Sequence, residues 1–443
     1  MQSLKLSENG RYLTYADGTP FFYMADTAWD LFYRLSPEEA DHYFSVRRSQ
    51  GFNAIQAILL GGVLGSDTAN VFGRKALNAD EDGVGILEQP DLEGEDNYWA
   101  TVLQMVRLAR QQELYMALLP GWLNKYYEPG LFSEEKALAY GRFLGAYFAQ
   151  EPNIIWVMGG DYQHKKKDCT SLIHAIAQGI RQTDMGDHLM TFHPAGNALM
   201  DPQPQFTSAG YPGVEEYVDF HGAQSGHGLC GYQSYLLLRY LRQQSHKPYL
   251  DLEARYENHS VYWRCHQYRF DPSDLRQVFY QNVLEGACGQ TYGHASIFAF
   301  SNPPDDLGSY GFYLKDMPSP GWKEALYADG ARQLGILKQL RLSRPYEEFR
   351  PVPELVESDD QVTLGHISVG RGEKYAFVYA PLGQSFKVHC AQLGGKLLRA
   401  TWLDPRTGEQ QQFAAVPPAD TLFVPPSAGK GNDWLLILDV WPE

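Results

Sequence analysis

Eight short apolar runs alternate with helical patterns between residues 21 and 300, and this rhythm constrains the fold more than any other feature. Helix signals separate the runs, such as the capping box at Ser36 and the Asp271-Pro272 start of a later helix. This alternation is typical of a (β/α)8 TIM barrel, with a doubly wound open sheet as the alternative. The expected strands are 21–27, 52–60, 114–120, 153–158, 189–194, 217–223, 248–253 and 295–300. Further helices are expected at 97–110, 134–149, 169–182, 232–244 and 322–341.

The two ends of the chain lack this alternation of apolar runs and helical patterns. An Asn9-Gly10 turn between alternating residues predicts an N-terminal β-hairpin. After Arg344-Pro345, short β-rich runs and turn signals replace the helical patterns, as in a small β-sandwich. We therefore expect a catalytic barrel with its hairpin over residues 1–343 and a C-terminal β-sandwich over residues 344–443.

Charge and cysteine content exclude several classes of protein. The net charge is −16, and the longest basic cluster is Lys165-Lys166-Lys167, so a nucleic-acid partner is not expected. The five cysteines never form C-x-x-C, which gives neither zinc spacing nor a disulfide framework. No apolar run is long enough to span a membrane, and the N-terminus lacks a signal-peptide pattern. We expect a cytoplasmic protein that uses no metal or cofactor and has no membrane partner.

Two acidic residues come at the carboxyl ends of expected strands. Asp161 follows Gly159-Gly160 at the end of the fourth strand, and Glu253 ends the seventh. Side chains alternate along a strand, so Asp161 should share a face with Ile155, and Glu253 should share one with Asp251. If these polar faces line the barrel interior, both carboxyl groups project over its C-terminal mouth.

Two carboxyl groups that face each other across a pocket are the minimum apparatus for glycoside hydrolysis. One protonates the leaving oxygen, while the other attacks the anomeric carbon or positions a water molecule. A separation of roughly 5–5.5 Å gives retention of configuration, and roughly 6.5–9.5 Å gives inversion.

Further polar and aromatic residues near the expected strand ends suit a polyhydroxylated ligand. The alternative for Asp26 is a helix cap, for Trp29 a core position, and for Glu257 an arginine partner. The candidate substrate-binding residues are Asp26, Trp29, Trp122, His193, Gln224, Ser225, His227, Tyr292 and His294. Those expected to support the site from behind are His221, Tyr256 and Glu257.

An ordered set of fragments resembles glycoside hydrolase family 140, the apiosidase-like hydrolases. The set includes "IIWVMGGD", "TFHPAG", "VDFHGAQSGH", "KPYLDLEARYE", "GQTYGHASIFAF" and the C-terminal "TWLDPRTGE". The resemblance covers both expected domains and implies a catalytic barrel with a C-terminal β-sandwich. It implies that Asp161 is the acid/base, that Glu253 is the nucleophile, and that the activity releases apiose from plant pectic side chains. The family usually has a small residue where this chain has Leu252.

We therefore predict an exo-acting, retaining glycosidase for a plant-derived oligosaccharide. One alternative is a metal-dependent barrel enzyme acting on sugars, an isomerase or a hydrolase, because the chain has 13 histidines. Against it, the first strand has no H-x-H and the chain contains no H-E-x-x-H. The other alternative is a catalytically inactive carbohydrate-binding protein. The presence of both carboxylates argues against it.

Overall fold

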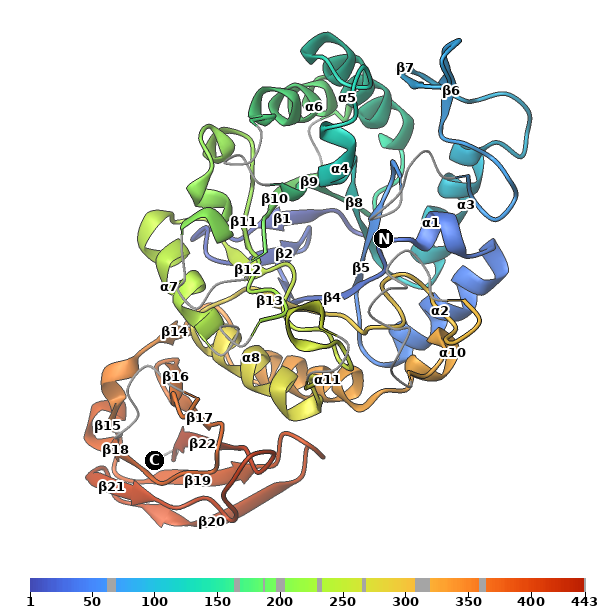
Figure 1. Cartoon of the computed structure of the whole chain (residues 1–443). Coiled ribbons are helices and arrows are strands. Elements are labelled where there is room, and N and C mark those ends of the chain that lie inside the picture. Colours follow the sequence, from blue (N-terminus) through green and yellow to red (C-terminus); the bar gives the residue numbers. More distant parts are fainter. Residues whose placement is uncertain are drawn as a thin grey trace.

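A curved parallel sheet forms the centre of the N-terminal part of the chain (Figure 1). The computed structural model describes residues 1–61, 69–162, 168–185, 188–196, 204–228, 233–264, 268–306, 319–357 and 364–441. Six strands are hydrogen-bonded in the order β10-β9-β8-β5-β4-β13. They are β4 (Tyr23–Thr27), β5 (Ala54–Ile58), β8 (Tyr115–Leu119), β9 (Ile154–Tyr162), β10 (Leu189–Pro194) and β13 (Gly289–Tyr292).

A two-stranded parallel sheet lies between the edges of the six-stranded one (Figure 1). It consists of β11 (His221–Ala223) and β12 (Tyr249–Asp251). The backbone N–H of Asp219, before β11, donates to the carbonyl of Met190 on β10 at 2.7 Å, and the N–H of Cys288, before β13, donates to Tyr249 at 2.9 Å. The expected eight-stranded barrel is thus observed as a curved six-stranded sheet with a two-stranded neighbour. The first parallel strand, β4, pairs with the last, β13, which favours the barrel over the doubly wound alternative.

Helices surround these strands (Figure 1). Two of them begin where predicted, at the capping box of Ser36 with Glu39 and at Asp271, which also forms a capping box, with Asp274. The expected helix at 322–341 is divided into two. The long helices are α2 (Pro37–Ser49), α3 (Tyr98–Gln111), α5 (Glu134–Phe148), α6 (Thr170–Thr183), α7 (Ser234–Gln244), α8 (Pro272–Leu284) and α11 (Asp329–Leu342). Short ones are α1 (Leu31–Arg34), α4 (Leu123–Tyr126) and α10 (Trp322–Ala325). Within the described residues, no helix has the length and apolarity to cross a membrane.

The eighth strand lies earlier than the sequence predicts. It is β13, and the apolar run 295–300 instead forms a buried turn in which Phe300 has a φ of 46°. A short buried apolar run does not distinguish a strand from other buried backbone. Gly289 lets β13 approach β4 closely, because a Cβ there would lie 2.1 Å from the carbonyl oxygen of Tyr23 on β4.

The predicted N-terminal hairpin is confirmed and lies at the amino end of the strands. It consists of β1 (Leu4–Leu6) and β2 (Leu13–Tyr15), followed by β3 (Pro20–Phe21). Tyr115, at the start of β8, donates its hydroxyl to the carbonyl of Gln2 at 2.6 Å and packs against Phe21. A second hairpin, β6 (Leu77–Ala79) with β7 (Gly85–Pro90), was not predicted.

The C-terminal part contains two antiparallel sheets that share an apolar core. Phe386 and Phe423 of the smaller sheet pack near Trp402 of the larger. The larger sheet contains β14 (Arg350–Pro351), β16 (Ser368–Arg371), β17 (Tyr375–Ala380), β22 (Trp434–Val440), β19 (Leu398–Leu403) and β20 (Gln410–Val416). The smaller contains β15 (Val356–Glu357), β18 (Phe386–His389) and β21 (Asp420–Phe423).

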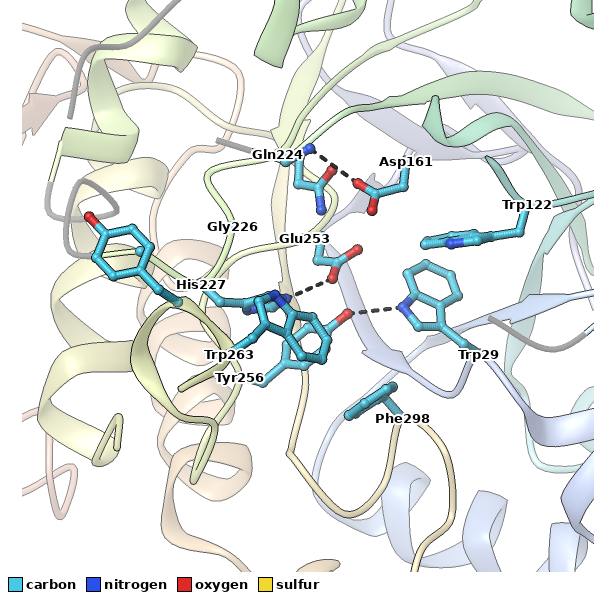
Figure 2. A pocket seen from close by; sticks show the side chains of 13 residues that line it. Trp29, Trp122, Asp161, Gln224, Gly226, His227, Glu253, Tyr256, Trp263 and Phe298 are labelled. Carbon is cyan, nitrogen blue, oxygen red and sulfur yellow. Dashed lines mark hydrogen bonds and ion pairs between the residues drawn. The ribbon is translucent and has the colours of Figure 1, made fainter. Parts of the chain in front are cut away.

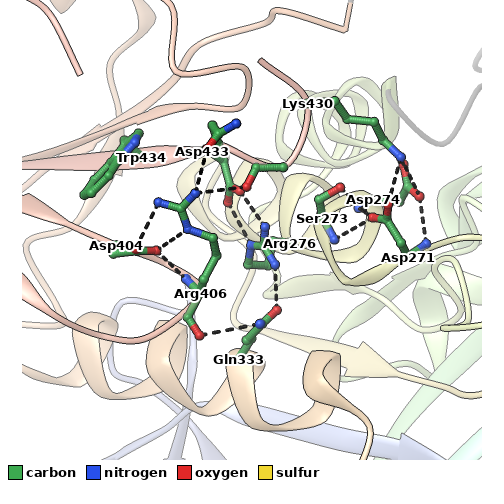
Figure 3. Close-up of polar contacts among 12 residues, drawn as sticks. Asp271, Ser273, Asp274, Arg276, Gln333, Asp404, Arg406, Lys430, Asp433 and Trp434 are labelled. Atoms are coloured by element: carbon green, nitrogen blue, oxygen red, sulfur yellow. Dashed lines mark hydrogen bonds and ion pairs between the residues drawn. The ribbon is translucent and has the colours of Figure 1, made fainter. Parts of the chain in front are cut away.

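A buried ion pair joins the two parts (Figure 3). Arg276 on α8 donates to both carboxylate oxygens of Asp433 at 2.9 and 2.6 Å. Arg276 also donates to Gln333 on α11, and Tyr379 donates its hydroxyl to Asp433 at 3.0 Å. The side chains of Arg276 and Asp433 are 4% and 2% exposed, so this ion pair between the two parts is shielded from solvent.

Candidate active site

A pocket of about 200 Å³ lies beyond the carboxyl ends of the parallel strands (Figure 2). Asp161 and Glu253, the two predicted catalytic residues, both line it. Its other lining residues are Trp29, Trp122, Gly196, Gln224, Gly226, His227, Gly228, Tyr256, Tyr262, Trp263 and Phe298.

A β-bulge on β9 turns Asp161 into the pocket. In the pairing with β10, His193 pairs with Gly159 but Pro194 pairs with Tyr162. Two residues of β9, Gly160 and Asp161, therefore have no partner on β10. Gly159, Gly160 and Asp161 all have positive φ, at 89°, 79° and 59°. A Cβ on Gly160 would lie 2.8 Å from the carbonyl oxygen of Gly121, so the site needs glycine there. Bulges of this kind re-aim a side chain, and aspartate tolerates the left-handed conformation better than most residues.

The surroundings of Asp161 favour its protonated form. Its Oδ1 accepts a hydrogen bond from the backbone N–H of Gly196 at 3.1 Å, and the side chain of Gln224 bonds to the same carboxyl group. Burial raises the pKa of Asp161, and the negative charge of Glu253 raises it further, against the smaller opposing effects of His193 and of the two hydrogen bonds from Gly196 and Gln224. Asp161 therefore has the properties of a general acid.

Glu253 reaches the pocket from a loop, because β12 ends at Asp251. The backbone carbonyl of Leu252 accepts from the Gln56 side chain at 2.9 Å, and the carbonyl of Glu253 accepts from the N–H of Gly226 at 3.0 Å. Asp251 does not share the inward face of Glu253. It accepts from Ser225 and from Asn282 on α8, so the strand alternation expected through Glu253 is wrong.

Two histidines hold the carboxylate of Glu253. The Nε2 of His193 lies 3.1 Å from Oε2. The Nε2 of His227 lies 2.9 Å from Oε1 (Figure 2). Burial alone would raise the pKa of Glu253, but the hydrogen bonds from the two histidines outweigh it and lower that pKa well below the usual range. The same contact with Glu253 raises the pKa of His193 against the effect of its own burial. Glu253 is thus held ionised.

Aromatic rings form the remaining walls (Figure 2). The ring centroids of Trp29 and Trp122 are 5.0 Å apart, and the indole N–H of Trp29 donates to the Tyr256 hydroxyl at 3.0 Å. Tyr256, predicted to support the site from behind, therefore lines it. Tyr262 and Trp263 were missed, because they lie in a loop where both have positive φ. Phe298 was also missed, since the run that contains it was interpreted as a strand.

Several predicted sugar contacts lie away from the pocket. Asp26 is fully buried and accepts from the Tyr43 hydroxyl and from Arg47, each at 2.6 Å. Ser225 is also buried, with its hydroxyl directed to Asp251. His193 is buried beneath the pocket, where it lies against Glu253, accepts from the backbone N–H of Asp161 at 3.4 Å and packs against Trp29 and Trp122. None of these three residues is part of the pocket lining, and their contacts instead support the strands and the carboxylate of Glu253.

Another predicted group lies near β13. Tyr292 donates its hydroxyl to Glu257 at 2.7 Å, and burial raises the pKa of Glu257 to about 7. His294 is buried and accepts from the N–H of Ser296 at 3.0 Å. His221 is buried between Ser208 and Glu215. None of these four residues lines the pocket, so the sugar contacts predicted for Tyr292 and His294 are not observed.

Across the part of the chain that the structure describes, no three His, Cys, Asp or Glu side chains are grouped so as to hold a metal ion.

Two carboxyl groups in one aromatic-walled pocket, with environments that displace their pKa values in opposite directions, are the arrangement that a glycoside hydrolase requires. A family model described as "Apiosidase-like, catalytic domain" matches residues 7–348, and the chain belongs to this family. The protein is therefore a glycosidase, and its substrate is a carbohydrate. A second model, described as "Putative collagen-binding domain of a collagenase", matches residues 351–439.

Two solved structures are similar over nearly the whole chain. One, titled "Glycoside hydrolase", shares 28% identity with a TM-score of 0.88, and the match covers 99% of this chain and 97% of that one. The other, titled as a glycoside hydrolase family 5 from Bacteroides vulgatus ATCC 8482, also shares 28% identity with a TM-score of 0.88, covering 99% and 93%. No curated protein matches the sequence.

Proposed function

We propose that the protein is a retaining, exo-acting glycosidase of glycoside hydrolase family 140, with Glu253 as nucleophile and Asp161 as acid/base. The observation that carries these two roles is the contrast between the partners of the carboxyl groups in one pocket, two histidines for Glu253 and a backbone N–H with a neutral amide for Asp161, with the pKa lowered for Glu253 and raised for Asp161. Environments that separate two carboxyl groups in this way assign the acid and the base.

In the first step, a Glu253 oxygen attacks the anomeric carbon while Asp161 gives its proton to the leaving oxygen, and the glycosidic bond breaks. The sugar is then esterified to Glu253, and Asp161 is ionised. In the second step, Asp161 takes a proton from a water molecule, whose oxygen attacks the same carbon and releases Glu253. Two inversions restore the original configuration.

The pocket supports removal of one terminal sugar. Its volume of about 200 Å³ is that of roughly seven water molecules, which suits a single sugar ring. Trp29, Trp122 and Trp263 offer aromatic faces, against which the apolar face of such a ring packs. We propose a plant-derived oligosaccharide as substrate and apiose as the first sugar to test, on the basis of the apiosidase-like family.

This mechanism requires β9 and β12 to lie on opposite sides of one closed ring of strands. We infer that β11 and β12 complete a closed eight-stranded barrel with the six-stranded sheet. The backbone bonds from Asp219 to Met190 and from Cys288 to Tyr249 support this closure at both edges.

Proton NMR of the first-formed sugar, with aryl glycosides as substrates, tests the stereochemistry. We expect the anomer of the substrate, and an inverted product would contradict retention. Azide supplies an independent assignment of roles. It should restore Asp161→Ala activity with a glycosyl azide of retained configuration, and Glu253→Ala activity with one of inverted configuration. The same product from both variants would refute the assignment.

A further inference from the structure

A second cavity, of about 390 Å³, lies at the opposite end of the strands. Tyr249, which starts β12, lines it, whereas Glu253 follows the carboxyl end of that strand. Other walls come from the N-terminal hairpin at Arg11-Tyr12, from Ala287-Cys288 before β13, and from the segment 346–351 that joins the two parts. The cavity is therefore separate from the catalytic pocket and cannot serve as one of its subsites.

The walls of this cavity are basic, although the chain carries a net charge of −16. Two of the cations are already neutralised, because Arg242 lies 2.7 Å from Glu285 and Lys247 lies 3.1 Å from Glu215. Their charges are satisfied outside the cavity. The cationic side chains in its lining are Arg11, Arg242, Lys247, Arg341 and Arg350, against the single carboxylate of Glu347.

Arg341 is a buried guanidinium with unused hydrogen-bonding capacity. Its side chain is stacked between Tyr346 and Phe349, with its Cζ 3.7 and 4.0 Å from the two ring centroids. Nη2 donates to the carbonyl of Tyr346 at 2.9 Å, but Nη1 is buried without a hydrogen-bond partner among the described residues. Burial lowers the pKa of Arg341, against the smaller opposing effects of Tyr346, Tyr375 and the Glu347 carboxylate. A buried cation of this kind is costly unless an anion joins it.

Arg350 provides a second guanidinium on the same cavity. It is exposed, and none of the hydrogen bonds or ion pairs found in the described parts of the chain involves its side chain. Two arginines that face one space suit a carboxylate, because each planar guanidinium presents parallel donors to paired oxygens.

We propose that this cavity is a binding site for an acidic saccharide, in which Arg341 and Arg350 hold a uronic-acid carboxylate. Its volume is about twice that of the catalytic pocket, which leaves room for a sugar beyond the charged group. The rings of Tyr12, Tyr249 and Phe349 supply aromatic surface for that sugar. Such a site would hold an acidic polysaccharide to the enzyme independently of the roles of Asp161 and Glu253.

Isothermal titration calorimetry of the full chain tests the site, with digalacturonic acid, its dimethyl ester and inorganic phosphate as probes. The diacid should bind and the neutral ester should bind at least about tenfold more weakly, with affinity for the diacid falling as salt rises. Arg350→Ala and Arg350→Glu should each weaken diacid binding at least about tenfold. Their turnover of a neutral aryl glycoside should equal that of the wild type, because Arg350 is far from the pocket.

Arg341→Met removes the buried charge and should have the same effect, provided that circular dichroism shows a folded protein. Arg142→Ala, an exposed arginine on α5, is the matched control and should bind normally. Unchanged diacid affinity in both Arg350 variants would overturn the proposal. So would binding that Trp122→Ala abolishes, which would place the ligand in the catalytic pocket. Phosphate that binds as tightly as the diacid and displaces it would reduce the cavity to a simple oxyanion site and refute the saccharide.

Discussion

The two carboxyl groups of the pocket differ because their partners differ. Glu253 lies against two imidazoles, with a hydrogen bond to His227 and a 3.1 Å contact to His193. Asp161 accepts from a backbone N–H and a neutral amide and faces the charge of Glu253. Burial disfavours the charged form of both carboxyl groups. At Glu253 the two histidines reverse this effect, whereas at Asp161 it remains. The chemistry of each residue is therefore set by its neighbours.

The pH dependence of kcat/KM should show this difference. Asp161 must be protonated to act, and its raised pKa extends activity to higher pH than an ordinary aspartate would allow. Glu253 must be ionised, and its lowered pKa keeps it so at low pH, which moves the acidic limb below the usual range of glutamate. In Asp161→Asn the basic limb should disappear for substrates with activated leaving groups. A basic limb that survives this substitution would belong to another group.

Removing one imidazole should change the pH profile as well as the rate. His227→Ala takes away the 2.9 Å hydrogen bond to Glu253, so the pKa of Glu253 should rise and the acidic limb should move upward. We expect kcat to fall about tenfold to hundredfold, the effect of a lost hydrogen bond to a charged group. His389→Gln, on the surface of the C-terminal part, is the control. A reduced rate with an unmoved acidic limb would mean that His227 has only a structural role.

At the scale of elements, the position of the site was predictable and much of its lining was not. Parallel strands present their carboxyl ends together, so polar residues after the fourth and seventh runs identified the mouth. Alternation placed Asp161 without revealing the bulge that aims it, and for Glu253 it failed because β12 ends at Asp251. Tyr262 and Trp263 have no sequence signal, since tertiary contacts impose their left-handed backbone.

The bulge on β9 gives a prediction with a matched control. Gly160→Ala combines a φ of +79° with a Cβ that would lie 2.8 Å from Gly121 and 2.9 Å from Trp122. Gly130→Ala has the same φ of +79° with nothing within 4 Å, so it isolates the backbone term. We expect Gly130→Ala to destabilise by about 1 kcal/mol with normal kcat. Gly160→Ala should destabilise more and lose most activity, because Asp161 is displaced. Equal effects in thermal unfolding and turnover would contradict this account of the bulge.

At the scale of the whole molecule, the buried pair of Arg276 with Asp433 ties α8 to the C-terminal part (Figure 3). Arg276→Met should lower the free energy of unfolding by about 3–5 kcal/mol, because it leaves the Asp433 carboxylate buried without its cation. Arg332→Met, which removes an exposed pair with Asp329, should change it by no more than about 0.5 kcal/mol. Chemical denaturation measures both. Replacing both buried partners, in Arg276→Met with Asp433→Leu, should recover much of the loss, because the stranded charge is gone. A double variant no more stable than the single one would contradict this explanation. The loss in Arg276→Met would then come from the missing attraction between Arg276 and Asp433, and not from the cost of a buried, unpaired carboxylate.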